Sequence, residues 1–425
     1  MLESFSFAHA LIIGVFVLGY AAIIIEHYTQ VNKTAVALLI AVICWSIQFI
    51  AHLQPANLQF AELGDHVNHT AQIIFFLLGA MTIVELVDSH KGFRILTDLV
   101  RTSSKRSLLI ILAVVTFFLS AVLDNLTTTI LMISLLRKLV PHKEDRFLLA
   151  CLVVIAANAG GAWTPIGDVT TTMLWIDGQI SSVAIMKSLF LPSLVSLIIP
   201  VVWYLRTFKG RIRSGSVQGS DTAAAPGAKL ILTLGMLSLI FVPIFKSWTG
   251  LPPFMGVLIG LAVLWLVTDI LHRGWEERAH LRVPHVLTKI DVSGVLFFLG
   301  ILLCVDALQT AGLLRALATW LDSVVHSQAI IATLIGIFSA IIDNVPLVAA
   351  TMGMYPLEQF PMDHTLWHMI AYAAGTGGSI LIIGSAAGVA MMGMEKVDFI
   401  SYMRKASLPA LLGYLAGMGI YLLMR

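Results

Sequence analysis

The sequence predicts an all-α protein that crosses a membrane many times and is built from two repeats of opposite topology. Of its 425 residues, 58% are hydrophobic and only 12% are charged, and the mean hydropathy is +0.92. A soluble domain is about a quarter charged. Apolar runs of about 17–20 residues, the length of a membrane-spanning helix, recur between short polar loops. The pair Asp124-Asn125 also recurs, as Asp343-Asn344, inside a second apolar run.

The apolar runs define the expected membrane segments. They fall at 9–26, 35–53, 71–88, 107–123, 127–139, 147–175, 183–204, 230–246, 254–271, 293–310, 328–342, 345–355, 367–394 and 407–424. The loops rich in Lys and Arg are placed in the cytoplasm, and those without either residue are placed outside. The cytoplasmic loops are then 89–106, 206–229 and 272–292, and the external ones are 54–70 and 176–182. The stretch 206–229 has the Ser-, Gly- and Ala-rich composition of a flexible linker, and it separates a first repeat, 1–205, from a second, 230–425.

The first Asp-Asn pair lies in a segment, 107–139, that has basic loops on both sides. Each half of this segment has about 15 residues, or roughly 22 Å of helix, which is shorter than the ~30 Å hydrocarbon core. We therefore expect a re-entrant hairpin that enters from the cytoplasm and turns at Asp124. The second pair lies in 328–355, between a loop 311–327 with a single Arg and a loop 356–366 with no Lys or Arg, so this hairpin is expected to enter from outside. Non-helical backbone at that depth requires a surrounding cavity.

Other blocks extend the repeat. FFLLGAMTIVELV at 75–87 is similar to LFFLGILLCVDAL at 296–308, and AANAGGAWTPIGD at 156–168 is similar to AAGTGGSILIIGS at 373–385. The expected directions of 71–88 and 293–310 are opposite, and such an inverted repeat is typical of secondary transporters. Two Gly pairs interrupt the long helices 147–175 and 367–394. The breaks are expected to expose backbone groups at mid-depth for ion binding, at Asn158, Gly160, Gly161, Gly377 and Gly378.

The acidic residues within these segments are candidates for function. A carboxylate that faces lipid at the bilayer centre costs about 2.5–3.5 kcal/mol on insertion scales, so Asp124, Asp168 and Asp343 are expected to line a common cavity. The structural alternative is that the hairpin aspartates only cap helices and that nearby threonines bond to their own helix. Glu85 and Asp306 match across the repeat near helix ends, where they are candidates for a proton relay or for structural ion pairs.

The stretches SAVLDNLTTT, NAGGAWTPIGDVTTT, SAIIDNVP and AAGTGGSILIIGSAAGVAMM together resemble the NhaD-type sodium/proton antiporters of the ion transporter superfamily. The resemblance implies a homodimer whose protomers each have a scaffold domain and a transport domain with two re-entrant hairpins. It also implies the essential residues Asp124, Asn125, Thr127, Asp168, Thr170, Thr171, Ser339, Asp343 and Asn344, to which Ser379 and Ser385 are added. The superfamily also contains dicarboxylate and citrate carriers, whose hairpin tips read Ser-Asn-Thr, and arsenite exporters. Aspartate at both tips of this chain favours a cation over an anion.

We therefore expect a secondary transporter in the bacterial cytoplasmic membrane that exchanges cytoplasmic Na⁺, and Li⁺, for external H⁺. Hard monovalent cations prefer oxygen ligands. Asp124, Asn125, Thr127 and the carbonyl groups at 158–161 can supply one ligand shell, which Asp343, Asn344, Thr376 and Ser379 can complete or duplicate. No cofactor, nucleic-acid partner or enzymatic activity is expected, and the inverted repeat and the missing GxGD motif argue against a membrane protease. A related anion carrier or arsenite exporter remains the alternative.

Overall fold

The computed structural model describes residues 6–24, 26–93, 102, 104–211 and 225–425, and the chain is helical, with no β-strand, over these residues. Eight helices in this part are long and apolar enough to cross a membrane, or nine if one bent pair is counted as a single span. The first half contains α1 (Phe7–Ile24), α2 (Glu26–Thr29), α3 (Lys33–Ile50), α4 (Ala56–Ser89), α6 (Lys105–Ser120), α7 (Asn125–Leu139), α8 (Lys143–Gly161), α9 (Val169–Ile176) and α10 (Ser182–Thr207). The second half contains α11 (Ala228–Thr249), α12 (Pro253–Leu271), α13 (Val283–Val286), α14 (Val292–Thr310), α15 (Leu313–Val325), α16 (Gln328–Phe338), α17 (Asn344–Met354), α18 (Thr365–Gly377), α19 (Ala386–Glu395), α20 (Phe399–Tyr402) and α21 (Leu408–Leu423).

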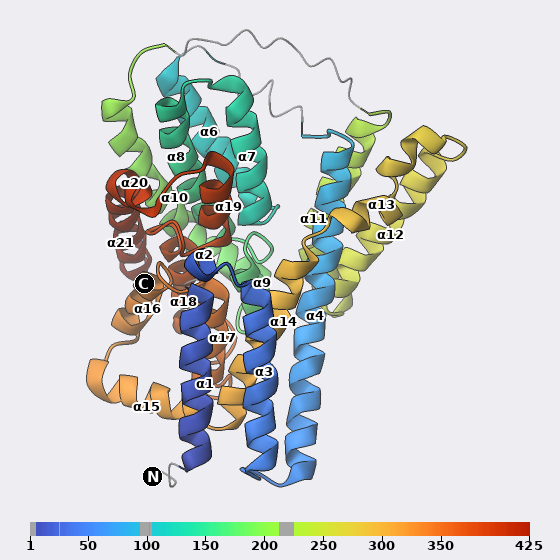
Figure 1. Cartoon of the computed structure of the whole chain (residues 1–425). Coiled ribbons are helices and arrows are strands. Elements are labelled where there is room, and N and C mark those ends of the chain that lie inside the picture. Colours follow the sequence, from blue (N-terminus) through green and yellow to red (C-terminus); the bar gives the residue numbers. More distant parts are fainter. Residues whose placement is uncertain (1–5, 25, 94–101, 103, 212–224) are drawn as a thin grey trace.

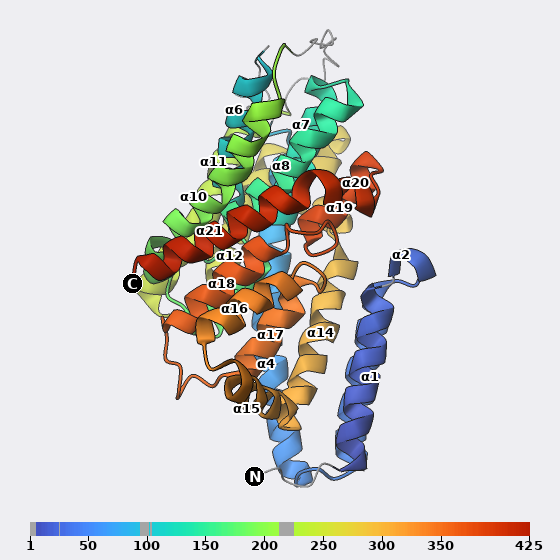
Figure 2. The same cartoon turned by 90° about the vertical axis from the view of Figure 1, so that its left-hand side faces the viewer.

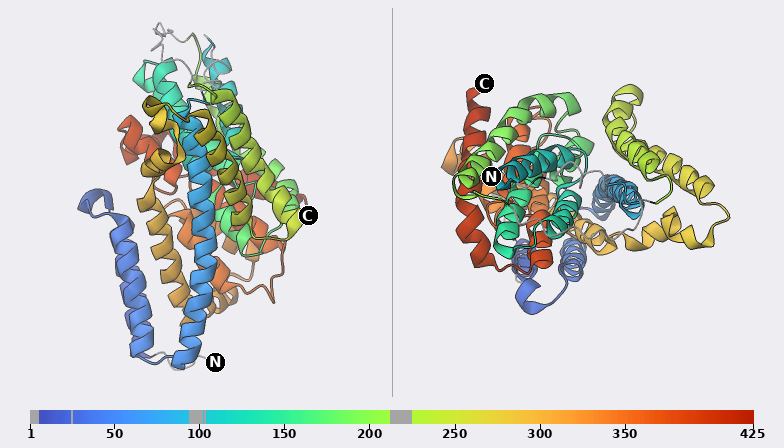
Figure 3. Two further views of the ribbon diagram at one scale, coloured as in Figure 1. Left: turned by 90° about the vertical axis from the view of Figure 1, so that its right-hand side faces the viewer. Right: turned by 90° about the horizontal axis from the view of Figure 1, so that it is seen from above.

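The long helices form two groups (Figures 1 and 3). We call α1, α3, α4, α11, α12 and α14 the panel, and α6–α10 together with α16–α21 the bundle. Seen from above, the panel is a curved wall beside the more compact bundle (Figure 3, right). Within the bundle, α21 packs along α10, so the last helix of the chain closes against the first repeat (Figure 2). Each group therefore combines segments from both halves of the sequence.

The two hairpins make equivalent contacts with the two broken helices. In the first, Ser120 Oγ donates to the carbonyl oxygen of Ala157 at 2.7 Å, and in the second, Ser339 Oγ donates to that of Ala374 at 3.1 Å. Figure 1 also shows α4 and α14 running in opposite directions, with α6–α7 at the top of the view and α16–α17 lower. These features support a repeat. That the two repeats have opposite orientations in the membrane, and that they span 1–205 and 230–425, stay predictions.

Two stretches that the sequence prediction treats as loops contain 13 or more consecutive helical residues in the structure. The stretch 54–70 was expected outside the membrane as a loop, but α4 begins at Ala56 and continues for 34 residues. Hydropathy marks the end of an apolar run, whereas a helix continues until something breaks it. Here the polar turns are held by side-chain contacts, such as Gln59 Nε2 donating to the Gln48 carbonyl at 3.1 Å and His66 pairing with Asp306 at 3.2 Å.

The stretch 311–327 was likewise treated as a loop, and it contains α15, which is bent by 117° from α16. The helix is amphipathic: Leu313, Leu314 and Ala318 are buried, while Trp320 is exposed. Its 13 residues are too short to be recognised as a span. The basic residues Arg94 and Arg101 of the loop 89–106 and the core of the linker, 212–224, lie outside the described residues.

Candidate functional site

A cavity of about 310 Å³ lies between the panel and the bundle. The bundle contributes both hairpin tips and the first residues of α9 and α19, and the panel contributes α4, α14 and the first residue of α3. The six predicted residues that line it are Asp124, Asn125, Thr127, Asp168, Asp343 and Asn344. The two Asp-Asn pairs, far apart in the sequence, thus share one cavity, as the composition of the apolar runs predicts.

Four helices begin at this cavity with a predicted site residue at the N-cap. Asp124, Asp168, Asp343 and Ser385 are the N-cap residues of α7, α9, α17 and α19. A helix N-terminus carries about half a positive charge, which favours an anion. In an anion carrier these ends would be free to face the substrate. Here an aspartate stands at three of the four N-caps, and the Asp124 carboxylate accepts the Thr127 N–H, so the cavity places negative charge beside these helix ends.

The first hairpin tip is connected to both broken helices through amide groups. Asn125 Nδ2 donates to Asn158 Oδ1 at 3.0 Å, and Asn158 Nδ2 donates to Ser385 Oγ at 2.9 Å. Asn158 is fully buried, and Ser385 also accepts from the Gly388 N–H. The side-chain amide of Asn158, beside the Gly pair, therefore positions the hairpin tip and the second broken helix.

The second hairpin tip reaches across to the first broken helix. Asn344 Nδ2 donates to Asp168 Oδ2 at 3.1 Å, and Asp168 is only 2% exposed. Among the described residues, neither Asn125 Oδ1 nor Asn344 Oδ1 accepts a hydrogen bond from the protein. Each tip thus uses its amide N–H for structure and leaves a carbonyl oxygen beside the cavity, where a small cation needs an acceptor.

Asp124 combines a capping role with its position in the cavity. Its Oδ1 accepts the Thr127 backbone N–H at 2.7 Å, and its Oδ2 accepts the Thr127 hydroxyl at 2.6 Å. The capping alternative is therefore correct as far as local structure is concerned. It does not remove Asp124 from the site, because the same carboxylate lines the cavity and a Ser or Asn would cap the helix without a charge.

The remaining hydroxyl residues lie behind the lining and bond mainly to the backbone. Thr171 Oγ1 donates to the Asp168 carbonyl at 2.9 Å, Thr376 Oγ1 to the Tyr372 carbonyl at 2.5 Å, and Ser379 Oγ to the Thr376 carbonyl at 2.7 Å. Thr170 is buried near Asp168, and Ser339 bonds to Ala374 as described above. The four bonded hydroxyl groups fit the structural alternative, whereas Thr170 Oγ1 is buried without a hydrogen-bond partner among the described residues. Ligation by any of these groups stays a prediction.

Glu85 and Asp306 lie outside the cavity lining. Glu85 accepts a hydrogen bond from Ser89 Oγ at 3.3 Å and lies 3.8 Å from Lys289 Nζ, and Asp306 pairs with His66. Both residues therefore have the ion-pair partners that the structural alternative requires. A proton-relay role stays a prediction for them.

Two charged residues of the lining were not predicted from the sequence. Asp291 is the N-cap of α14, and Lys33, the first residue of α3, lies 3.8 Å from Asp343. A signal for Lys33 was present, since it is the only Lys or Arg among the first 90 residues. No group of three His, Cys, Asp or Glu side chains is arranged to chelate a metal ion in the described part of the chain. The carboxylates thus line the cavity without forming a closed chelate.

The chain is similar to known membrane transporters. Residues 20–375 match the family described as citrate transporter. The chain is 54% identical over 419 residues to sodium/proton antiporter 1 of Arabidopsis thaliana, covering 98% of this chain and 72% of that protein. It is 30% identical over 457 residues to the Na⁺/H⁺ antiporter NhaD of Vibrio cholerae, covering 99% of this chain and 94% of the relative.

The fold is also similar to a solved one. The crystal structure of the Alcanivorax borkumensis YdaH transporter matches with a TM-score of 0.57 and 13% identity, over 93% of this chain and 99% of the other. At that identity the similarity concerns the fold alone. From the sequence matches, the chain belongs to the NhaD-type family of sodium/proton antiporters, membrane transporters within the larger family described as citrate transporter.

Proposed function

We propose that this protein exchanges Na⁺, and Li⁺ as a second substrate, for H⁺, with the metal ion leaving the cytoplasm and the proton entering. The observation that carries the proposal is that three aspartates at helix N-cap positions, Asp124, Asp168 and Asp343, line one cavity. A monovalent cation prefers such oxygen atoms, together with the two free Asn carbonyl groups. The names of the relatives, sodium/proton antiporter and NhaD, support the same assignment.

Exchange follows when the two cations compete for the same carboxylates. A site holding Na⁺ has lost its protons, and a protonated site has no charge left to hold Na⁺. The empty, charged site is costly to carry through a low-dielectric region, so only the loaded forms cross. The bundle holds most of the site and is the proposed transport domain, and the panel is the proposed scaffold against which it moves.

A citrate carrier is the second candidate, because the family description names citrate. Charge argues against it. The lining contains four carboxylates, of Asp124, Asp168, Asp291 and Asp343, and one basic residue, Lys33. A trianion entering this cavity would meet like charges, because an aspartate stands at three of the four helix N-termini that would otherwise attract it.

Location and assembly stay proposals. The bacterial NhaD relatives support a bacterial cytoplasmic membrane, while relatives at 50% and 54% identity occur in a plant. A homodimer is implied by the family resemblance, and a protein mass of twice 46.2 kDa in detergent micelles would support it, whereas a single-chain mass would contradict it.

The test is dissipation of an imposed pH gradient in everted membrane vesicles. Na⁺ or Li⁺, but neither citrate nor arsenite, should collapse the gradient in the wild type. Asp124→Asn should abolish the response, because the tip would lose its charge while keeping a side chain that caps. Asp398→Asn is the matched control, since Asp398 caps α20 in the same way but is exposed and away from the cavity. A full Na⁺ response from Asp124→Asn would reject the site.

A further inference from the structure

The two hairpin aspartates, Asp124 and Asp343, occupy equivalent positions, but their side chains make different hydrogen bonds. Asp124 bonds to the third residue of its helix, Thr127, through both the N–H and the hydroxyl group. The equivalent third residue after Asp343 is Pro346, which has no N–H and no hydroxyl group. Asp343 accordingly makes no capping hydrogen bond with its side chain. Its carboxylate is left available to another partner.

That partner is Lys33. Its Nζ lies 3.8 Å from Asp343 Oδ2 and 4.4 Å from the centre of the Phe297 ring, which holds the ammonium group by a cation–π contact. The side chains of Lys33 and Asp343 are 31% and 19% exposed, so water reaches the pair through the cavity. Lys33 is also the one basic residue in a lining with three further carboxylates.

Lys33 belongs to the panel, whereas Asp343 belongs to the bundle. The start of α3 is fixed to α14 by Thr34 Oγ1, which donates to the Ser293 carbonyl at 2.9 Å, and Trp45 Nε1 donates to the Leu303 carbonyl at 2.8 Å. The ammonium group therefore moves with the panel. The pair connects the two groups of helices across the proposed cation site.

We propose that Lys33 competes with the transported cation: its ammonium group pairs with the Asp343 carboxylate and is displaced when the cation binds there. The inference rests on the proposed function of the same site. An ammonium group is a monovalent cation attached to the scaffold, so it competes with Na⁺ for one carboxylate. When Na⁺ replaces it, this ion pair between the panel and the bundle is broken. Binding of the substrate thereby removes a contact that opposes their relative movement.

The experiment compares the KM for Na⁺ and the maximal rate of the full chain in proteoliposomes, at one fixed alkaline pH where proton competition is least. Lys33→Met removes the competing charge and keeps the length of the side chain. Its KM for Na⁺ should fall about fivefold, the size expected for losing a partly exposed ion pair. Lys33→Arg restores the charge and should return KM towards the wild-type value. Lys33→Gln replaces Lys33→Met if the latter does not accumulate.

Lys246→Met is the matched control. Lys246 also projects from the panel onto the bundle over an aromatic ring, 4.6 Å from the centre of the Trp175 ring, but it donates to the Trp175 carbonyl and does not line the cavity. Its loss should leave KM unchanged.

The outcomes separate this inference from the proposed function. A wild type without a Na⁺ response would overturn both. A responding wild type whose KM is unaltered by Lys33→Met would overturn the role of Lys33 alone. A fall in maximal rate with no change in KM would assign Lys33 a structural role and would likewise overturn the inference.

Discussion

Glycine at the helix breaks is required by contact with a neighbouring backbone. A Cβ atom at Gly160 would collide with the carbonyl oxygen of Phe117, and one at Gly377 with the carbonyl oxygen of Gly336. Backbone atoms cannot move aside as a flexible side chain can. The Gly pairs, which the sequence suggested as helix breakers, thus also let each hairpin approach its broken helix closely enough for the serine contacts at Ser120 and Ser339.

Gly160→Ala should therefore be destabilising by about 2 kcal/mol, the usual range for overpacking a tight site. Thermal unfolding in detergent measures the effect, and Na⁺-driven transport should fall with it because the hairpin tip is displaced. Gly14→Ala in α1 is the control, since a Cβ there meets no atom within 4 Å. Equal unfolding temperatures for the two variants would contradict the close-contact explanation.

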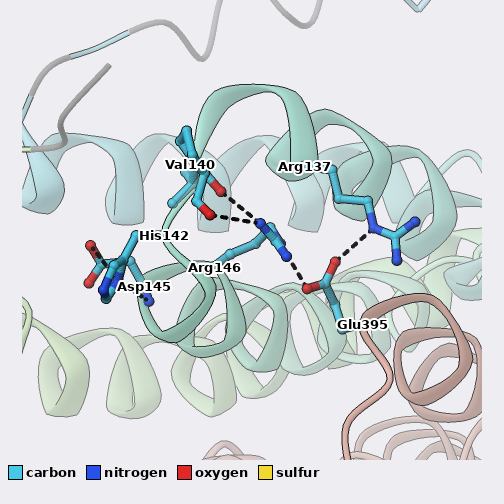
Figure 4. Close-up of polar contacts among 7 residues, drawn as sticks. Arg137, Val140, His142, Asp145, Arg146 and Glu395 are labelled. Atoms are coloured by element: carbon cyan, nitrogen blue, oxygen red, sulfur yellow. Dashed lines mark hydrogen bonds and ion pairs between the residues drawn. The ribbon is translucent and has the colours of Figure 1, made fainter. Parts of the chain in front are cut away.

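At the scale of elements, one buried glutamate joins three helices on the side of the bundle drawn in Figure 4. Glu395, at the end of α19, accepts from Arg137 Nε at 2.9 Å and from Arg146 Nε at 2.8 Å, and its side chain is 3% exposed. Arg146 also donates to the Val140 carbonyl at 3.0 Å, just past the end of α7. The carboxylate thus fixes the outer end of the first hairpin to the second broken helix.

Glu395→Gln should lower the free energy of unfolding by about 2 kcal/mol, because Arg146 is left with an uncompensated, largely buried charge. Asp269→Asn is the control, since Asp269 pairs with Arg282 at 2.7 Å but both side chains are more than a third exposed, and such pairs contribute about 0–1 kcal/mol. The unfolding temperatures of both variants, measured in detergent, test this prediction. A larger loss of stability in Asp269→Asn than in Glu395→Gln would contradict the role of Glu395 in joining these helices.

For the molecule as a whole, a pair of buried histidines makes stability depend on pH. His90 and His272 follow directly after α4 and α12, and their Nε2 atoms lie 2.9 Å apart. His90 Nδ1 donates to the Leu86 carbonyl at 2.7 Å, so its Nε2 accepts the His272 N–H when both rings are neutral. Burial lowers the pKa of both rings, that of His272 to about 4, where the neighbouring His90 adds to the effect.

Since the folded state resists protonation that the unfolded chain accepts, stability should fall as the pH decreases from about 6.5 towards about 4. A proton on His90 Nε2 would also oppose the His272 N–H and break the bond between the helices, whereas a proton on His272 Nδ1 would be buried without a hydrogen-bond partner among the described residues. The unfolding temperature in detergent, measured across this range, should fall less in a His90→Leu/His272→Leu double variant than in the wild type. His285→Leu, an exposed histidine of the same region, is the control. Parallel curves for the wild type and the double variant would exclude the pair as the cause.

Much of the architecture follows from local features of the sequence. The apolar runs locate the helices, because burial in lipid requires a minimum length of hydrophobic chain. Asp124, Asp168 and Asp343 were predicted to share a cavity because an isolated carboxylate is too costly in a membrane, and all three line one cavity. The roles of the hydroxyl residues, of Glu85 and of Asp306 stay predictions. The helical start of α4 and the amphipathic α15 were missed, because hydropathy measures apolar length and not helical continuity.

By itself, then, the sequence determined the membrane class, the repeat, the acidic tips and the breaks at the glycines, all of which depend on residues close together in the chain. Only the tertiary structure decided which distant residues meet. The contact of Lys33 with Asp343, of Asn344 with Asp168 and of Glu395 with two arginines joins segments that no local periodicity relates. A charged side chain within an apolar segment indicates that it needs a polar or oppositely charged neighbour, but the packing of the helices determines which residue that neighbour is. For that reason the carboxylates could be named in advance and the lysine that faces one of them could not.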